Sequence, residues 1–359
     1  MKKILIFLLV VCSTLSFSKT AIGGDKNEEF NVTDMIMHHI KDSHEFHVLD
    51  WNGKAFSIPL PIVLWTDNGL VTFMSSEFNH DDNGEVVVSK NNQSFVKFHE
   101  KIFYASDSVN SNNQYLTLDE SFYPTNGKPL DFSITKLVFS MFLSMLILIL
   151  IFGFSARNYN KSSDGIPSGI AKFTEPLILF VRDEVAIPNI GEKNYKKYMP
   201  YLLTLFFFIW VNNLMGLIPM PPFSGNLSGN IAFTAILALI TFIITTFVGN
   251  KDYWKHIFWM PGVPVPMKLF LAPIEFMGIF IKPISLMIRL FANISAGHII
   301  VLSLISLIFI AESVWIAPAS LFFSVFISVI EILVVAIQAY IFTMLSALYI
   351  GAAMEEHEH

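Results

Sequence analysis

The sequence predicts an all-α membrane protein with a small β-rich exported segment at its N-terminal end. The first observation behind this fold class is composition, because the 359 residues are 53% hydrophobic and include 35 phenylalanines. The second is a set of long apolar stretches, separated by charged or turn-rich breaks, that runs from about residue 134 to the end. The third is the polar, acidic and turn-rich character of residues 19–130. This combination is typical of a multi-span membrane protein rather than a large soluble enzyme.

Composition also excludes several classes of function. The net charge of −6 argues against a nucleic-acid partner. A single cysteine, Cys12, excludes an internal disulfide and a cysteine metal cage. The chain contains no phosphate-binding loop, dinucleotide fingerprint or zinc-protease helix, so we expect neither a cofactor nor chemistry on a bound small molecule.

Residues 1–18 have the pattern of a signal peptide. Lys2 and Lys3 form its charged start, Ile4 to Val11 its apolar core, and residues 16–18 a small-x-small cleavage site. A lipoprotein signal with Cys12 as the lipidated residue is the disfavoured alternative, because Val11 is bulky where a small residue is required.

Residues 19–130 are interpreted as an exported accessory segment with short strands. The runs expected to form strands are Phe56–Trp65, Leu70–Met74, Glu85–Val88 and Phe95–Tyr104, with Asp-Asn-Gly breaks at 67–69 and 82–84. A histidine-rich stretch before them could bind a metal through His38, His39, His44, Glu45 and His47. An exposed polar leader is the favoured interpretation, since these residues lack regular ligand spacing.

Residues 131–359 form the predicted membrane domain. Three ordinary transmembrane helices are expected at Ile134–Phe154, Tyr201–Ile218 and Asn230–Val248, and an amphipathic surface helix at Lys172–Ala186. The last 90 residues form two apolar arms, Lys268–Ile310 and Pro318–Ala353. Each arm exceeds the ~20 residues that cross a bilayer upright, so we expect a long tilted membrane-embedded helical hairpin.

Basic residues set the expected orientation. They follow the first and third spans and are absent after the second, which places the loops after the first and third spans in the cytoplasm. The mature N-terminus is then outside, in the periplasm, and the C-terminus is cytoplasmic. The expected location is the inner (plasma) membrane of a bacterium.

Five polar residues fall on one face of the first arm at helical spacing: Glu275, Lys282, Ser285, Arg289 and Asn293. An arginine at the centre of a bilayer costs roughly 2.5–3.5 kcal/mol or more, so Arg289 must face protein, water or an opposite charge. No acidic residue falls beside it in either arm. Its partner carboxylate is therefore expected on another chain.

Counting outward from the hairpin turn pairs residues of the two arms. His298 lies level with Glu331, and Arg289 lies close to Gln338, as buried polar groups in a low dielectric require. His298 and Glu331 either hold the hairpin together or relay protons, and the relay is favoured because both titrate. For Gln338 and Asn293, a role in packing stays as plausible as a role in transport. Glu275 is either a salt-bridged anchor with Lys282 or, as favoured, part of an exit path.

These residues resemble subunit a of the F-type ATP synthases. The resemblance rests on KPISLMIRLFANISAGHII, the later Glu331/Gln338 pair, FVRDEVA, NNLMGLIP and the closing AMEEH, and it covers about residue 130 to the end. It implies a stator channel subunit that works against a ring of c subunits, with the b subunit stator stalk and the rest of the complex as further partners.

The same resemblance implies residue roles. Arg289 matches the essential arginine that attracts the carboxylate of each passing c subunit and blocks direct ion leakage. Asn293, His298, Glu331 and Gln338 match positions lining the exported half-channel. Glu275 and Ser285 match positions on the cytoplasmic side.

Two features depart from the family pattern. In some members the carboxylate precedes the histidine, whereas here His298 precedes Glu331, and a swap across the hairpin keeps the pair in contact. Residues 1–130 have no counterpart in the common family core, so the resemblance says nothing of their role. Ion choice, proton or sodium, depends largely on the ring's carboxylate site.

Two further functions are weighed. A stand-alone ion-coupled secondary transporter would use the polar stripe as a substrate site, but the internal repeats and paired broken helices typical of that class are not evident. A membrane-anchored surface binding module would make the exported segment the main actor. Deleting residues 30–120 while measuring coupling separates this last possibility from a passive extension.

Overall fold

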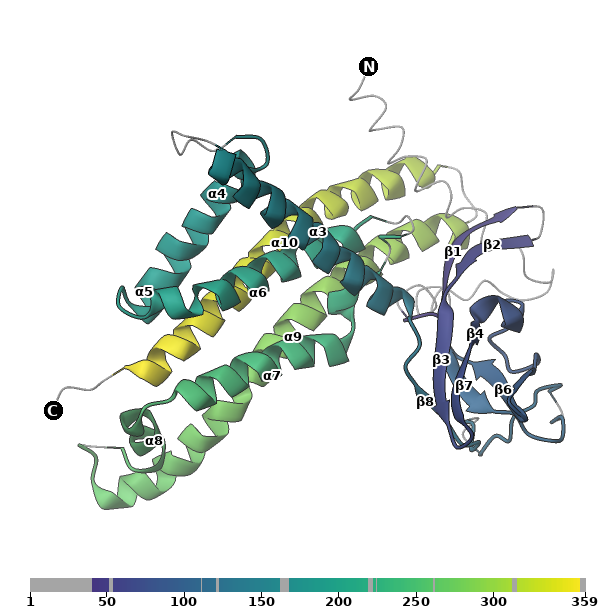
Figure 1. Ribbon diagram of the computed structural model, residues 1–359, viewed down its shortest axis with the longest axis horizontal. Coiled ribbons are helices and arrows are strands. Elements are labelled where there is room, and N and C mark those ends of the chain that lie inside the picture. The colour runs from purple at the N-terminus through teal and green to yellow at the C-terminus, as the bar shows by residue number, and fades with distance from the viewer. Residues whose placement is uncertain are drawn as a thin grey trace. The chain divides into compact units, whose positions relative to one another are not determined.

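A computed structural model of the chain describes residues 41–51, 54–110, 112–120, 123–161, 168–218, 222–223, 225–260, 262–311 and 315–355. The chain forms two compact units. Unit 1 comprises the residues up to Met141 together with 218–225, and unit 2 comprises Phe142–Leu217 and Asn226 onward (Figure 1). The predicted signal peptide and the candidate ligands His38 and His39 fall outside the described residues.

Unit 1 contains three small antiparallel sheets. Strand β1 (Glu45–Trp51) pairs with β2 (Lys54–Pro59). Strand β3 (Pro61–Thr66) is the centre of the order β4-β3-β8, with β4 (Gly69–Met74) and β8 (Leu130–Asp131). The third sheet is a meander of β5 (Val88–Lys90), β6 (Gln93–Phe98) and β7 (Lys101–Tyr104), and the short 3₁₀ helix η2 (Ser75–Phe78) precedes it.

The strand predictions are partly right. β4 coincides with the expected run Leu70–Met74, but Phe56–Trp65 divides into β2 and β3 at Leu60, and only Val88 of Glu85–Val88 is in a strand. Phe95–Tyr104 is a hairpin that turns at His99 and Glu100, both with positive φ. Positive φ at both central residues is the two-residue hairpin geometry that normally favours Asn-Gly or Asp-Gly, so the sequence gives little sign of this turn.

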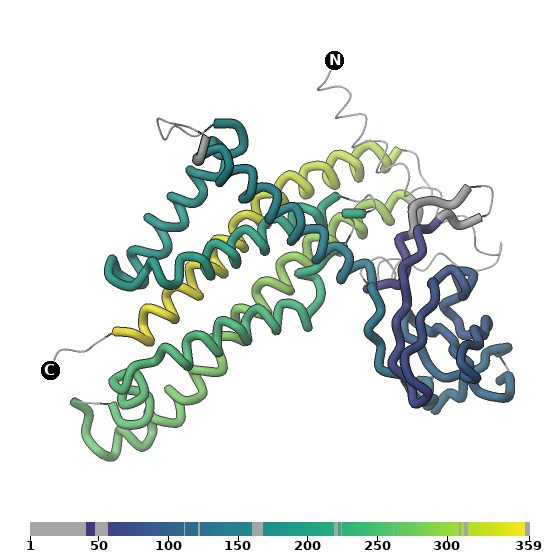
Figure 2. Tube along the Cα trace, in the orientation of Figure 1, coloured from purple at the N-terminus to yellow at the C-terminus, as the bar shows by residue number. Residues whose placement is uncertain are grey.

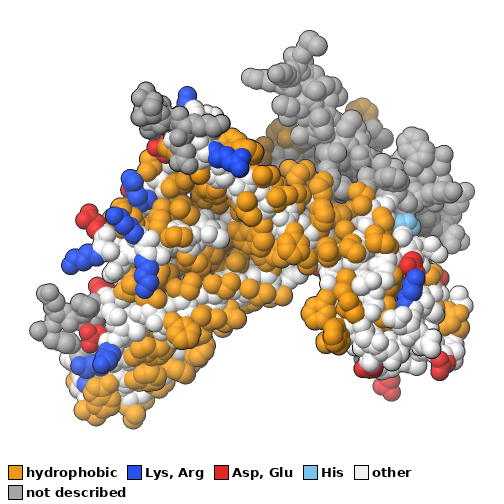
Figure 3. All heavy atoms as spheres, viewed as in Figure 1, with side chains coloured by type: hydrophobic (Ala, Val, Ile, Leu, Met, Phe, Trp, Pro, Cys, Tyr) orange, Lys and Arg blue, Asp and Glu red, His pale blue; other side chains and the backbone are white. Residues whose placement is uncertain are grey.

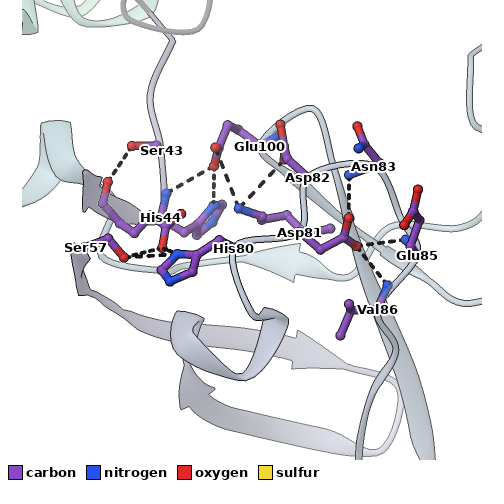
Figure 4. Close-up of polar contacts among 12 residues, drawn as sticks. Ser43, His44, Ser57, His80, Asp81, Asp82, Asn83, Glu85, Val86 and Glu100 are labelled. Carbon is purple, nitrogen blue, oxygen red and sulfur yellow. Dashed lines mark hydrogen bonds and ion pairs between the residues drawn. The ribbon is translucent and has the colours of Figure 1, made fainter. Parts of the chain in front are cut away.

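A buried network of charges joins the sheets of unit 1 (Figure 4). The His44 side chain lies between two carboxylates, with Nε2 3.3 Å from Asp131 Oδ2 and Nδ1 3.7 Å from Glu100 Oε2. Lys97 continues the network, with its Nζ 3.7 Å from Glu100 and 3.9 Å from Asp82. Burial opposes the charged imidazolium, but the hydrogen bonds to Asp131 and Glu100 outweigh it and raise the pKa of His44 to about 9.

The network corrects the favoured interpretation of the histidine-rich stretch as an exposed polar leader, because His44 is only 2% exposed. It also bears on the alternative, a metal site. His44 is engaged by Glu100 and Asp131, while the Glu45 carboxylate accepts a hydrogen bond from Ser57 and lies 2.8 Å from His80. Within the described part of the chain, no group of three or more His, Cys, Asp or Glu side chains could hold a metal ion.

Unit 1 also holds the start of the first long helix, α3 (Lys136–Lys161). The backbone N–H of Lys136 donates to the Ser43 carbonyl, and that of Leu137 donates to the Asp42 carboxylate. On the other side, Ile134 N–H donates to the Pro61 carbonyl. The orphan N–H groups of the helix start are thus satisfied by the β-rich unit, which fixes the helix start to it.

Unit 2 is helical (Figures 1 and 2). After α3 come α4 (Ala171–Phe180), the π-helical turn η3 (Val181–Ala186), α5 (Ile187–Ile190), α6 (Tyr195–Gly216), the short 3₁₀ helix η4 (Leu227–Gly229), α7 (Ile231–Val248), α8 (Lys251–Phe258), α9 (Val265–Ile310) and α10 (Ala317–Met354). The described residues contain five helices long and apolar enough to cross a membrane, namely α3, α6, α7, α9 and α10.

The membrane helices agree with the prediction in type and differ in extent. The two arms form continuous helices that pack against each other, and α6 and α7 fall within a few residues of the expected spans except that α6 begins earlier, at Tyr195. The expected helix Lys172–Ala186 is present as α4 and η3. Its Val181 and Val185 are fully buried, and this stretch packs against α6 and α10, while its location at a membrane surface stays a prediction.

The sequence pattern does not predict helix α8, because its eight residues fall in the expected loop after the third span. Its N-cap, Asn250, accounts for its position, since the Asn250 N–H donates to the Ala353 carbonyl and its side-chain amide donates to the Met354 carbonyl 2.9 Å away. These bonds attach α8 to the end of α10. A polar chain links other helices, from Tyr201 on α6 through Thr241 on α7 to Ser346 on α10.

His44→Gln should destabilise unit 1 by up to roughly 3–5 kcal/mol, because Asp131 loses its cation and the buried Glu100 keeps only Lys97. Since the folded-state pKa of His44 is raised, its contribution is complete below its unfolded value near 6.5 and is lost as pH rises through about 9. Pulse proteolysis of the full chain at pH 6.5, 8 and 9.5 measures both effects.

His80→Gln is the matched control, since His80 lies on the surface beside Glu45. A variant at His44 as stable as this control, or a wild type whose stability does not fall between pH 6.5 and 9.5, would contradict the account of the network.

Candidate functional site

The polar stripe of α9 lies beside the face that packs into the core of unit 2. Ile279, Leu286, Leu290 and Ile294 are buried. Arg289 and the other four residues of the predicted stripe are half-buried or exposed. Ser285, Arg289 and Asn293 each directly precede a buried residue of the helix, so they point about 100° away from the core. This places them at the margin of the packed helices.

Arg289 has no acidic partner among the described residues, none of which forms an ion pair with it. Its guanidinium is within electrostatic range of the Tyr349 hydroxyl on α10. Lys282, seven residues or about two helical turns earlier, lies over the same Tyr349 ring with its Nζ 5.5 Å from the ring centroid. The predicted proximity of Arg289 to Gln338 stays a prediction.

His298 and Glu331 meet across the hairpin, as the count from the turn predicts. His298 Nε2 lies 3.8 Å from Glu331 Oε1, and both atoms are buried without a hydrogen-bond partner in the described structure. This separation is too long for a direct hydrogen bond. A small movement of either side chain, or one bridging water molecule, would satisfy both groups.

Gly297 makes this contact possible. A Cβ built at Gly297 would lie 2.5 Å from Glu331 Oε1 and 2.8 Å from its Cδ, so any larger residue would displace the carboxyl group. Glu331 itself is 5% exposed, although its helix is otherwise rich in exposed apolar side chains. The glycine and the acid are thus complementary parts of one site.

The remaining stripe and channel candidates are separate from this pair. Gln338 is buried on the same face of α10 as Glu331, seven residues further on. Asn293 is exposed and Ser285 half-buried on α9. Neither exposure nor burial here separates a transport role from a packing role, so these three assignments stay predictions.

The structure adds polar groups that the sequence prediction did not include. Side-chain atoms that are buried without a hydrogen-bond partner in the described residues occur in Asn213 on α6, in Asn226 and Ser228 at η4, in Ser295 on α9 and in Ser324 on α10. Because η4 packs against α6, α7 and α9, and α6 packs against α10, these groups lie on α9 and α10 or on elements packed against them. Each is an uncharged residue in an apolar context, so only tertiary packing identifies it.

Glu275 lines a cavity of about 210 Å³ near the other end of α9, with Tyr253, His256, Ile279, Lys282 and Glu355. Burial raises the pKa of Tyr253, and the negative charge of Glu275 adds to the effect. The alternative role predicted for Glu275, a salt bridge to Lys282, is wrong in this structure, because no ion pair joins these two described residues. The seven-residue spacing puts both on one face but about 10 Å apart along the helix axis.

Arg289 therefore lies between two polar regions on the same helix. His298 is nine residues beyond it, or about 14 Å, and Glu275 is fourteen residues before it, or about 21 Å. The arrangement offers one buried polar region toward the hairpin turn and one cavity toward α8, and Arg289, without an acidic partner among the described residues, lies between them.

Comparison with known proteins gives two family matches. The model of the family described as ATP synthase A chain matches residues 138–351. A second model, described only as a domain of unknown function (DUF8433), matches residues 35–132.

Curated relatives of the membrane part are each named ATP synthase subunit a. One from Chlorobium phaeobacteroides (strain BS1) is 47% identical over 64% of this chain and 68% of its own length. One from Chloroherpeton thalassium is 43% identical over 64% of this chain and 69% of its own. For one from an Anaeromyxobacter species the identity is 41% over 64% of this chain, and the match spans only 56% of the relative.

Proposed function

The chain belongs to the ATP synthase A chain family, and from that membership we propose how its polar residues carry protons. It is the proton-translocating stator subunit of an F-type ATP synthase and a multi-pass membrane protein. As a channel and stator subunit, it carries no active site for nucleotide chemistry. None of the matches favours a stand-alone transporter.

The proposed proton path consists of two half-channels, which open on opposite sides of the membrane. The inlet runs among α6, η4, α9 and α10, the elements that carry the unpaired buried atoms of Asn213, Ser228, Ser295 and Ser324 as well as His298 and Glu331. Buried polar atoms in this number require ordered water, since each would otherwise lose a hydrogen bond. The outlet opens at the cavity lined by Glu275.

The cytoplasmic side is assigned to the end of unit 2 that carries α5, α8 and the end of α10. Lys and Arg side chains gather at that end (Figure 3), which is the bias expected for cytoplasmic segments. The outlet with Glu275 and Ser285 then faces the cytoplasm, and the inlet with Asn293, His298, Glu331 and Gln338 faces the exported side of a bacterial inner membrane. The exported N-terminus and cytoplasmic C-terminus follow from the same orientation.

Arg289 separates the half-channels and carries the proposal, because it has no acidic partner among the described residues. A ring of c subunits would present a carboxylate to it at each step. The deprotonated carboxylate is attracted to the guanidinium, and the protonated form is free to move on into lipid. A guanidinium suits this position because it does not lose its proton, whereas a lysine could. The b subunit stalk would hold the chain still while the ring turns.

His298 and Glu331 relay protons at the inlet. Their atoms lie 3.8 Å apart, close enough to share a proton through a small movement or one water.

Domain boundaries follow the same assignment, with residues 1–18 as a signal peptide, 19–130 as an exported accessory segment and 131–359 as the channel.

Arg289→Ala should lower the rate of coupled ATP synthesis by about 100-fold or more. Loss of one preorganised stabilising group typically lowers a rate by this factor. Passive proton leak through the assembled complex should stay equal or rise. Synthesis and leak are measured on inverted membrane vesicles, with Arg157→Ala, an exposed basic residue of α3, as the control. Undiminished synthesis in the Arg289 variant would refute the assignment.

Glu331→Gln should slow proton flow by about 100-fold, the lower range for loss of a positioned acid–base group, without dismantling the complex. Combining it with His298→Asn should add little further loss, because both changes break the same relay. Proton uptake by the purified complex in liposomes gives the four rates of the cycle. Normal flux in the single variant would reduce the pair to a structural contact.

Gly297→Ala tests the same site without removing a titratable group. The new methyl overlaps the Glu331 carboxyl, so proton flow should fall several-fold while the complex still assembles. Gly278→Ala on the same helix is the matched control, since a Cβ there meets nothing within 4 Å. Equal flow in the two variants would show that the position of the carboxyl does not limit transport.

A further inference from the structure

The outer face of the β4-β3-β8 sheet in unit 1 is apolar where a solvated sheet face would be polar. Trp65 of β3 stands directly opposite Leu70 of β4 on one side and Leu130 of β8 on the other. The three side chains are 57%, 54% and 63% exposed. The alternate residues Ile62 and Leu64 are fully buried beneath them. Both faces of this sheet are therefore hydrophobic, although only one packs into the core of the unit.

Two more side chains enlarge this apolar face. Phe132, which continues β8 and donates its N–H to the Val63 carbonyl, is 66% exposed, and Met74 at the end of β4 is 42% exposed. No charged side chain alternates with them on these strands, because Asp131 turns inward to His44. Figure 3 shows hydrophobic side chains along the flank of unit 1 where Figure 1 draws β3 and β8.

The size of the face argues against a stable protein partner. Five side chains that expose about half of their surface present on the order of 500 Å². A standard protein interface covers roughly 800 Å² on each partner. The face is larger than isolated surface leucines would explain, yet it is smaller than an interface that holds two folded proteins together.

The connection to the first membrane helix brings the face to the bilayer. Phe132 lies four residues before Lys136, where α3 begins, and four extended residues span at most about 14 Å. The start of α3 is also fixed to this unit, since Ile134 N–H donates to the Pro61 carbonyl of β3 and Lys136 N–H donates to the Ser43 carbonyl. A helix that crosses the membrane therefore holds the sheet at the level of the headgroups, whose layer is only several ångströms thick on each side.

We infer that the face formed by Trp65, Leu70, Met74, Leu130 and Phe132 docks onto the outer leaflet of the lipid bilayer. Its chemistry is that of the membrane interface, where tryptophan and other aromatic side chains concentrate. Unit 1 then rests on the membrane surface, and its orientation to the bilayer is set by lipid as well as by its connection to α3. This inference does not depend on the proton path.

Collision-based electron paramagnetic resonance on the full chain in phosphatidylcholine nanodiscs tests the docking. A nitroxide is attached at Leu70→Cys or, separately, at Leu130→Cys, each in a Cys12→Ser background. Glu85→Cys, an exposed loop position of the same unit, is the control. The ratio of oxygen to Ni-EDDA collisions reports whether the label lies in lipid or in water.

Docking predicts that both face positions give an oxygen to Ni-EDDA ratio several-fold above that of the control. A ratio equal to the control at both positions would overturn the inference by showing a face in water. Suppression of both collision rates at Leu70→Cys and Leu130→Cys would overturn it in favour of a protein that covers the face. Neither of these results would affect the Arg289 or Glu331 experiments.

Discussion

An uncompensated cation within an apolar helix is the constraint around which the membrane unit is built. Arg289 cannot be neutralised by losing its proton, and the described residues offer it no carboxylate. Burial of an unpaired charge is unfavourable, and the arginine lies at the margin of the helix packing, beside the buried face of Leu286 and Leu290. A margin position leaves the guanidinium reachable by a group that arrives from outside the subunit. The titratable pair and the outlet cavity are placed on either side of it along the same helix.

Spacing alone was enough to pair His298 with Glu331. Two long helices joined by a short turn have a fixed rise per residue, so residues equidistant from the turn must lie level with each other. The same reasoning identified the polar stripe and the five membrane helices, because long apolar periodicity survives any tertiary arrangement. It did not identify Gly297 as the residue that admits the carboxyl group, since a glycine in a helix has no distinctive pattern until its neighbour is known.

Features that depend on tertiary contacts escaped prediction. Asn213 and Ser228 are ordinary polar residues in the sequence and become notable only when η4 packs between α6 and α9. Helix α8 is too short to be recognised without Asn250, which bonds to the end of α10. The hairpin at His99 and Glu100 places a glutamate at positive φ, where this residue type is uncommon, and Glu100 is held there by its place in the His44 network.

The attachment of α3 to unit 1 has a consequence for biosynthesis. The Lys136 N–H donates to the Ser43 carbonyl and the Leu137 N–H to the Asp42 carboxylate, so the two ends of the β-rich segment meet at the helix start. The β-rich unit cannot close until residue 137, the second residue of the first membrane helix, has been synthesised. Folding of the unit is therefore coupled to the start of that helix, and a substitution that delays one would delay the other.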